Sequence, residues 1–202
     1  MSEVFISYRR NDSAGYAHAV YHGLLQHFSK DQLFMDVDTV EPGVDFISVI
    51  EEAVGKCDAL LAVIGKRWAM AGSDTRSRLD DANDFVRLEI STALERNIRV
   101  IPVLVDGMTI PSAETLPDVL KPRSRRNAME ISNTRFNFDI ERLVTAVRRI
   151  IDDTELRRTP KEKKEILYSR KNLRRTDRRR SVHDNLLGKR LHRRSMNRWN
   201  GC

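Results

Sequence analysis

The sequence holds few of the residues on which secreted or metal-stabilised proteins depend. Only two cysteines, Cys57 and Cys202, occur among 202 residues, which excludes a disulfide framework and a cysteine-ligated zinc site. The longest clean apolar run, Ala59–Gly65, is far shorter than the roughly 20 residues of a membrane-spanning helix. Met1–Arg10 has no apolar segment behind a charged start, so we expect no signal peptide. These absences predict a soluble, cytoplasmic protein without a transmembrane segment.

Several ligand-binding motifs are missing as well. No G-x-G-x-x-G follows a predicted strand and no G-x-x-x-x-G-K-[ST] occurs, so Rossmann-type dinucleotide binding and a P-loop are unsupported. His18 and His22 are four residues apart, but Ala19 stands where a zinc-binding H-E-x-x-H needs glutamate. Asp36 and Asp38 have no further ligands near them in the sequence, and helix capping or loop hydrogen bonds explain them better than a metal. We therefore expect no metal site.

The positive charge of the chain is concentrated at its C-terminal end. The whole sequence carries 36 Lys+Arg against 29 Asp+Glu, a net charge of +7. Residues 155–202 hold 17 basic and 5 acidic residues, a net of +12, which leaves residues 1–154 at −5. We expect a domain over 1–151 and a basic extension over 152–202 that is disordered or marginally helical. Such an extension either binds nucleic acid or an anionic surface through its cations, or is solvated without a partner.

Apolar periodicity predicts alternating strands and helices over residues 1–151. Short β-branched or aromatic runs predict five strands: Val4–Arg9, Leu33–Val37, Ala59–Gly65, Arg99–Val105 and Ala128–Ile131. Helical spacing predicts four helices: Ala14–Phe28, Phe46–Gly55, Asp84–Arg96 and Phe138–Ile151. This alternation predicts an α/β domain with a flavodoxin-like, doubly wound, five-stranded parallel sheet. Pro102 indicates that the fourth strand is an edge strand or has a bulge.

Three loops follow the predicted strands on the side where such sheets bind ligands, near the point where strand order reverses. They are Arg9–Ser13, Asp36–Gly43 and Lys66–Asp84. Arg9 and Arg10 would repel a divalent cation there and attract a phosphate; ordinary surface cations are the alternative. Trp68 either fills the core or lines the cleft, and its residue type favours the core.

Phe85 and Glu89 are the residues of the helix Asp84–Arg96 that indicate a ligand. The apolar face of this helix consists of Val86, Ile90, Ala93 and Leu94. Glu89 falls on the flank of that face, and Phe85, four residues earlier, lies on the same side. An aromatic ring beside a carboxylate fits a nucleoside, because the carboxylate can accept ribose hydroxyls. The simpler alternative is a surface glutamate paired with Arg87 or Arg96.

The ordered set of these segments resembles a Toll/interleukin-1 receptor (TIR) domain of the bacterial type. The matching segments are Val4–Arg10, Leu33–Val37 with Glu41–Gly43, Ala59–Gly65 with Trp68, Asp84–Ile90 and Val100–Val105. The resemblance covers residues 1 to about 151. It implies the TIR fold, with the long BB loop of the family around Glu41–Gly43.

The resemblance also implies an NAD⁺ glycohydrolase of bacterial immune or stress signalling. Such an enzyme breaks the nicotinamide–ribose bond, giving nicotinamide and either ADP-ribose or a cyclic isomer, so NAD⁺ is a substrate and no cofactor is implied. Glu89 falls on the catalytic position of the family, and Phe85 falls where many enzymatic members carry Trp. The other implied substrate-binding residues are Tyr8, Arg9 and Arg10 at the nucleotide, Asp36, Glu41 and Gly43 in the segment that closes over it, and Trp68.

Self-association is a further implication of the resemblance, because sites of this kind often assemble across two subunits. TIR domains also act without catalysis, through contacts with other TIR proteins. A non-enzymatic adaptor is therefore the alternative function. Glu89 favours the enzyme, since an adaptor needs no acid there, whereas Phe85 in place of Trp favours the adaptor.

Overall fold

The computed structural model describes residues 3–35, 45–69, 77–112, 114, 116–120 and 127–158. Asp36, Glu41 and Gly43, and with them the BB-loop prediction, lie outside these residues. The prediction for the basic extension concerns residues that are also outside the described part, apart from its first few.

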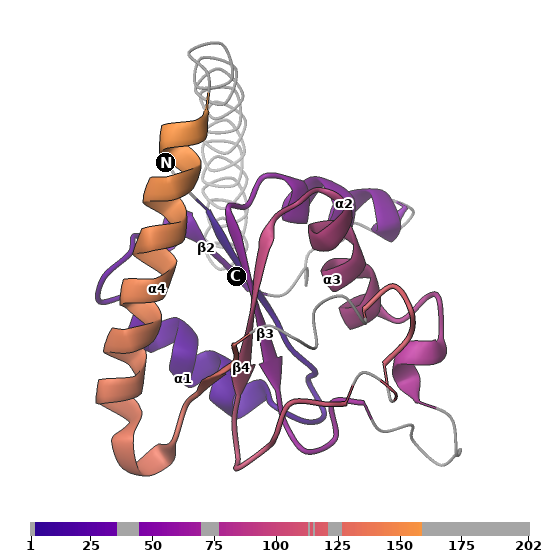
Figure 1. The fold of residues 1–202 in the computed structure, drawn as a ribbon, viewed down its shortest axis with the longest axis horizontal. Coiled ribbons are helices and arrows are strands. Elements are labelled where there is room, and N and C mark those ends of the chain that lie inside the picture. The colour runs from indigo at the N-terminus through magenta and orange to yellow at the C-terminus, as the bar shows by residue number, and fades with distance from the viewer. Residues whose placement is uncertain are drawn as a thin grey trace, which may run out of the picture. The chain divides into compact units, whose positions relative to one another are not determined.

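Five parallel strands form a single sheet in the order β2-β1-β3-β4-β5 (Figure 1). The strands are β1 Val4–Ser7, β2 Leu33–Met35, β3 Ala59–Ile64, β4 Arg99–Leu104 and β5 Met129–Glu130. β1 lies between β2 and β3, with Val4 in register with both Leu33 and Ala59. The predicted flavodoxin-like sheet is confirmed, because strand order reverses at β1.

Two helices cover each face of the sheet (Figure 1). The helices are α1 Ala14–Leu24, α2 Phe46–Gly55, α3 Phe85–Glu95 and α4 Phe136–Arg157, with short 3₁₀ turns η1 Lys30–Gln32, η2 Arg78–Asp80 and η5 Asn133–Arg135. α1 ends at Leu24 rather than at the predicted Phe28, since a turn follows it. α4 continues beyond the predicted Ile151 to Arg157.

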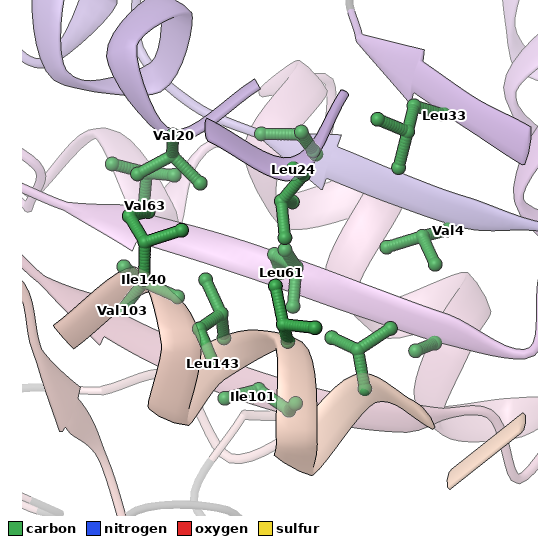
Figure 2. Close-up of a cluster of buried hydrophobic side chains, with 14 of the residues drawn as sticks. Val4, Val20, Leu24, Leu33, Leu61, Val63, Ile101, Val103, Ile140 and Leu143 are labelled. Carbon is green, nitrogen blue, oxygen red and sulfur yellow. The ribbon is translucent and has the colours of Figure 1, made fainter. Parts of the chain in front are cut away.

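One apolar layer lies between the sheet and helices α1 and α4 (Figure 2). Val20 and Leu24 of α1 and Leu143 of α4 pack there against Leu61 and Val63 of β3. All five side chains are fully buried. At roughly 1.5–3 kcal/mol for each large aliphatic side chain removed from water, this layer fixes α1 and α4 to the sheet.

The alternate residues of the same strands form the second apolar layer, beneath α2 and α3. Leu60 of β3 contributes to it, together with Ile50 and Val54 of α2 and Ile90 of α3. β3 is therefore covered on both faces, as its uninterrupted apolar sequence predicts. The first turn of α3 is consequently held close to the carboxyl edge of the sheet.

The prediction that Pro102 marks an edge strand or a bulge needs correction, because β4 lies inside the sheet and its register with β3 is unbroken. β4 pairs with β3 from Arg99 to Leu104, but it pairs with β5 only at Val103 and Leu104. Pro102 thus stands on the part of β4 where the described part of β5 offers no partner. The missing N–H of the proline is tolerated because β5 is short.

Candidate active site

Three segments meet at the carboxyl edge of β1 and β3, where the order of the strands reverses. They are residues 8–13 after β1, residues 65–69 after β3, and residues 77–89, which run through η2 into α3. The chain leaves β1 toward α1 on one face of the sheet, and the chain after β3 reaches α3 on the other face. Ligands of doubly wound sheets bind where adjacent connections diverge in this way. Two of the three predicted loops, Arg9–Ser13 and the described part of Lys66–Asp84, therefore share one location.

A buried ion pair joins the first of these segments to the start of α3. The Arg9 guanidinium donates from Nη1 to Asp84 Oδ2 at 2.7 Å and from Nη2 to Asp84 Oδ1 at 3.0 Å. The two side chains are only 4% and 6% exposed. Arg9 Nε also donates to the backbone carbonyl of Trp68. Interpreting Arg9 as an ordinary surface cation is therefore wrong, because its charge is satisfied inside the protein.

Asp84 has a second task, which is to cap α3. It precedes Phe85 in extended conformation, and its Oδ1 accepts a hydrogen bond from the backbone N–H of Arg87 at 3.0 Å. A carboxylate at this position satisfies one of the backbone donors at the helix start and interacts favourably with the helix dipole. The same carboxylate therefore fixes both the Arg9 guanidinium and the first turn of α3.

Two further arginines lie near the start of α3. Arg78 of η2 brings its Nε to 3.9 Å from Asp84 Oδ2 and donates from Nη1 to Asn11 Oδ1 at 3.4 Å. Arg87 donates from Nη1 to the carbonyls of Leu79 and Asp80 at 3.0 and 2.9 Å. Arg78 thus lies beside the pair of Arg9 and Asp84, whereas the Arg87 guanidinium binds the backbone of η2.

Asp12 joins the loop after β1 to the loop after β3. Its Oδ1 accepts from the backbone N–H of Arg67 at 2.8 Å. A Cβ placed on Gly65 would lie 2.5 Å from Asp12 Oδ2, so only glycine leaves room for this carboxylate. Ser13 adds a hydrogen bond from its Oγ to the carbonyl of Val63 at 3.4 Å. The two loops are thus held together by side chains as well as by the sheet.

Glu89 lies in the buried stripe of α3 rather than on its flank. Its residue exposure is 8%, and Val86, Ile90 and Ala93 on the same helix are also buried. These positions follow the i, i+3, i+4, i+7 spacing of an inward-facing stripe, with glutamate at the second place. The alternative of a helix-surface glutamate is therefore wrong.

The aromatic residues of the predicted site differ in their exposure. Phe85, the first residue of α3, is 56% exposed. Tyr8 is half-buried, packs against the apolar layer beneath α1, and meets His18 edge-to-face with ring centroids 6.1 Å apart. Trp68 is 4% exposed and belongs to the apolar layer beneath α2 and α3, which is the position that the core interpretation predicted. Arg10 is exposed.

Four predicted residues share one side of the site: Arg9 and Trp68 are in direct contact, and Phe85 and Glu89 lie on the helix that Asp84 caps. The Tyr8 side chain instead packs in the layer beneath α1. The sequence analysis missed Asp84, Asp12 and Arg78. Only Asp84 carried a local signal, since an aspartate directly before an apolar helical stripe is a capping pattern.

The described residues contain neither a membrane-spanning helix nor a metal-binding cluster. None of the helices described is long and apolar enough to cross a lipid bilayer. Within the same part of the chain, no three His, Cys, Asp or Glu side chains gather in a way that could hold a metal ion.

The family of this chain follows from its sequence. A model of the TIR domain family matches residues 4–144, which is more than half of the chain. The chain therefore belongs to the TIR domain family. It matches none of the curated proteins with which it was compared.

Solved structures with a similar fold are distant in sequence. The TIR domains of the activated Roq1 resistosome, which directly recognizes the pathogen effector XopQ, match with a TM-score of 0.50 at 15% identity, over 75% of this chain and 99% of that chain. A metazoan TIR-STING receptor from C. gigas, in complex with 2′,3′-cGAMP, matches with a TM-score of 0.47 at 19% identity, over 70% of this chain and 38% of that chain. The TIR domain of the Toll-related receptor TRR-2 from Hydra magnipapillata has a TM-score of 0.43 at 14% identity, over 72% of this chain and 99% of that chain.

Proposed function

We propose that this TIR domain cleaves the nicotinamide–ribose bond of NAD⁺, with Glu89 as the catalytic residue. The observation that carries the proposal is the burial of Glu89, at 8% exposure, one turn beyond the capped start of α3. A carboxylate held in the interior beside the switch point of the sheet can act on a developing positive charge with little competition from bulk water. Family membership supports the proposal, since the resemblance implies a catalytic glutamate at this position.

The chemistry suits a buried carboxylate. As the C–N bond to nicotinamide breaks, its electron pair leaves with the nicotinamide ring and positive charge develops on the ribose, as in glycoside hydrolysis. A fixed carboxylate in a water-poor site stabilises that charge more strongly than water does. Nicotinamide departs as a neutral base, so no strong acid is required. Water then bonds to the ribose carbon and loses a proton to give ADP-ribose; attack by a group of the same ADP-ribosyl fragment gives a cyclic isomer.

The surrounding residues are proposed to hold the dinucleotide. Phe85 offers an exposed ring at the start of α3, where a base or ribose can pack on it, and Tyr8 and the exposed Arg10 border the same edge of the sheet. Asp36, Glu41 and Gly43 belong to the segment proposed to close over the substrate. Arg9 and Trp68, both buried, would contribute from behind the surface of the site.

Self-association is proposed to complete the site. The resemblance implies a closing segment supplied across two subunits, and one similar structure is of TIR domains in an assembled resistosome. We propose that the protein acts in immune or stress signalling. Assembly would switch on NAD⁺ consumption, and other TIR proteins would be its partners.

Product analysis after incubation with NAD⁺ tests the proposal. Wild-type protein at high concentration should release nicotinamide together with ADP-ribose or a cyclic isomer, and Glu89→Ala should release almost none. Glu95→Ala is the matched control, since Glu95 is exposed near the end of the same helix and its loss should leave release unchanged. No release by the wild type would favour the adaptor function. Equal release by wild type and Glu89→Ala would refute the role of Glu89.

A further inference from the structure

We infer that Arg9 and Asp84 form a positioning pair, which fixes the start of α3 and thereby the placement of Glu89 at the site. The inference rests on the proposed function, and it deepens it. It assigns Asp84 a role that the sequence pattern does not, and it gives Arg9 a role other than direct contact with the nucleotide.

The hydrogen bonds of Arg9 are directed at the protein itself. Of the five N–H groups of a guanidinium, one goes to the Trp68 carbonyl and two go to the carboxylate of Asp84, at 2.7 and 3.0 Å. The Arg9 side chain is 4% exposed, so it has little surface to offer a phosphate. Its planar, bidentate geometry instead fixes the direction of the Asp84 carboxylate.

Asp84, fixed in this way by Arg9, is bonded to the first turn of α3 through two hydrogen bonds. Its Oδ1 accepts from the backbone N–H of Arg87 at 3.0 Å, and its backbone carbonyl accepts from the N–H of Leu88 at 2.9 Å. These bonds fix the first turn of the helix, and Glu89 is the next residue along it. Because the helix backbone is stiff, a shift of Asp84 moves the Glu89 carboxylate with it. Misplacing a catalytic group by about 1 Å can slow a reaction by about 100-fold.

The pair joins all three segments of the candidate site. Arg9 follows β1, Trp68 follows β3, and Asp84 begins α3. Each segment is already attached to the sheet by its own apolar contacts, so stability alone does not require a buried ion pair here. Buried ion pairs can often be replaced by apolar residues without loss of stability. Apolar residues, by contrast, cannot reproduce the directed hydrogen bonds of an ion pair. This favours a positioning role for Arg9 and Asp84.

Kinetics of conservative variants test the inference. Arg9→Lys keeps the charge and loses the bidentate fork, and Asp84→Asn keeps a capping oxygen and loses the charge. Both variants should lower kcat for nicotinamide release, measured per folded protein, by about 10- to 100-fold and change KM much less. The double variant should be no slower than the slower single variant, because the two residues act as one unit.

Asp139→Asn is the matched control for a buried carboxylate. Asp139 is buried at the start of α4 and accepts from the backbone N–H of Ser132 at 3.0 Å, far along the chain from the site. This variant should melt at a lower temperature but keep the wild-type kcat. A raised KM for Arg9→Lys with an unchanged KM and kcat for Asp84→Asn would overturn the inference, since it would indicate direct contact of Arg9 with the substrate.

Amide hydrogen exchange separates this inference from the proposed function. Without substrate, the amides of residues 85–89 should exchange faster in Arg9→Lys and Asp84→Asn than in wild type, whereas Asp139→Asn should not change them. If the wild type released no nicotinamide, the proposed function would fail, and exchange alone would decide whether the pair fixes α3. Unchanged exchange at residues 85–89 in both variants would overturn the inference whatever the activity.

Discussion

Three of the buried acidic side chains differ in what surrounds them. Asp84 is held in a bidentate pair by Arg9, and Asp139 accepts a hydrogen bond from the backbone of Ser132. Both carboxylates therefore accept hydrogen bonds from donors of the protein. Glu89 occupies an inward-facing place in the apolar stripe of α3. At the scale of the single residue, this position is what distinguishes Glu89 from an ordinary helix glutamate.

Cys57 is a buried group of another kind. Its side chain lies in the apolar layer beneath α2 and α3, with Sγ 3.3 Å from the carbonyl oxygen of Ala53. Burial raises the pKa of the Cys57 thiol well above its ordinary value, and the nearby carboxylates of Glu3 and Asp58 raise the pKa further. The thiol therefore stays protonated in the folded protein at pH values at which it ionises in the unfolded chain.

We predict an alkaline loss of stability that depends on Cys57. Because the folded pKa is raised, the contribution is fully present below the unfolded thiol pKa of about 8.5 and declines as pH rises above it. At pH 10 the loss is about 2 kcal/mol, at about 1.4 kcal/mol for each pH unit. Urea unfolding of wild type and Cys57→Ala at pH 7.5 and pH 10 measures it. The variant, although less stable at pH 7.5, should lose less between the two pH values; an identical loss in both proteins would contradict the prediction.

At the scale of the element, the start of α3 is fixed to the rest of the domain by a buried ion pair as well as by a local cap. α2 also begins at an aspartate, Asp45, whose side chain accepts from the N–H of Ile47 at 3.2 Å and from Ser48 Oγ at 2.8 Å. Asp45, however, is exposed, and its capping contacts are local. Asp84 adds a buried partner 75 residues away in the chain. The two caps therefore allow the local and the tertiary contributions to be separated.

We predict that Asp84→Ala destabilises the domain much more than Asp45→Ala. Loss of an exposed cap costs about 1 kcal/mol. Loss of Asp84 also leaves the Arg9 guanidinium buried without its carboxylate, and breaking a buried pair in this way costs about 3–5 kcal/mol. Free energies of unfolding from urea titration of both variants provide the comparison. Similar losses in the two variants would mean that the buried pair contributes nothing beyond the cap.

The type and order of the elements could be predicted from sequence, because apolar spacing reports directly which side chains face the core. β3 and the stripe Val86, Ile90 and Ala93 of α3 are clear examples. The end of α1 and the interior position of β4 were mispredicted, since both depend on packing between distant segments. The burial of Glu89 was missed because a polar residue in an apolar stripe is usually assigned to the flank.

The pairing of Arg9 with Asp84 could not have been predicted from local pattern. Each residue, taken alone, is a common surface residue, and only the parallel crossovers of the sheet bring them together. The loops that hold them could be predicted, because the carboxyl ends of neighbouring parallel strands share one edge. Sequence thus located the region of the site but not its internal contacts.

At the scale of the whole molecule, the chain joins a domain of negative net charge to a strongly basic end. The net charge of +7 arises entirely from residues 155–202, since residues 1–154 carry −5. The charge of the whole chain therefore says little about the candidate site. Arg10 and Arg78 are exposed cations at the candidate site, whereas Arg9 is buried in its pair with Asp84.

We predict that specific activity rises with protein concentration. If assembly completes the site, dilution should lower the rate of nicotinamide release per protein molecule, and the decline should follow the loss of oligomers. Light scattering and activity measured on the same dilution series provide the test. A protein that is monomeric during the assay and retains full specific activity would show that one copy of the chain suffices.

The central claim is that the buried carboxylate of Glu89 stabilises the charge that develops on the ribose of NAD⁺. Nicotinamide release per folded protein by Glu89→Gln, relative to wild type, tests it most directly, because the substitution removes the charge and keeps the size of the side chain. We predict that the rate of Glu89→Gln falls by at least about 100-fold and that its melting temperature does not fall. The exposed control Glu95→Gln should keep the wild-type rate. A folded Glu89→Gln protein that releases nicotinamide at the wild-type rate would contradict the claim.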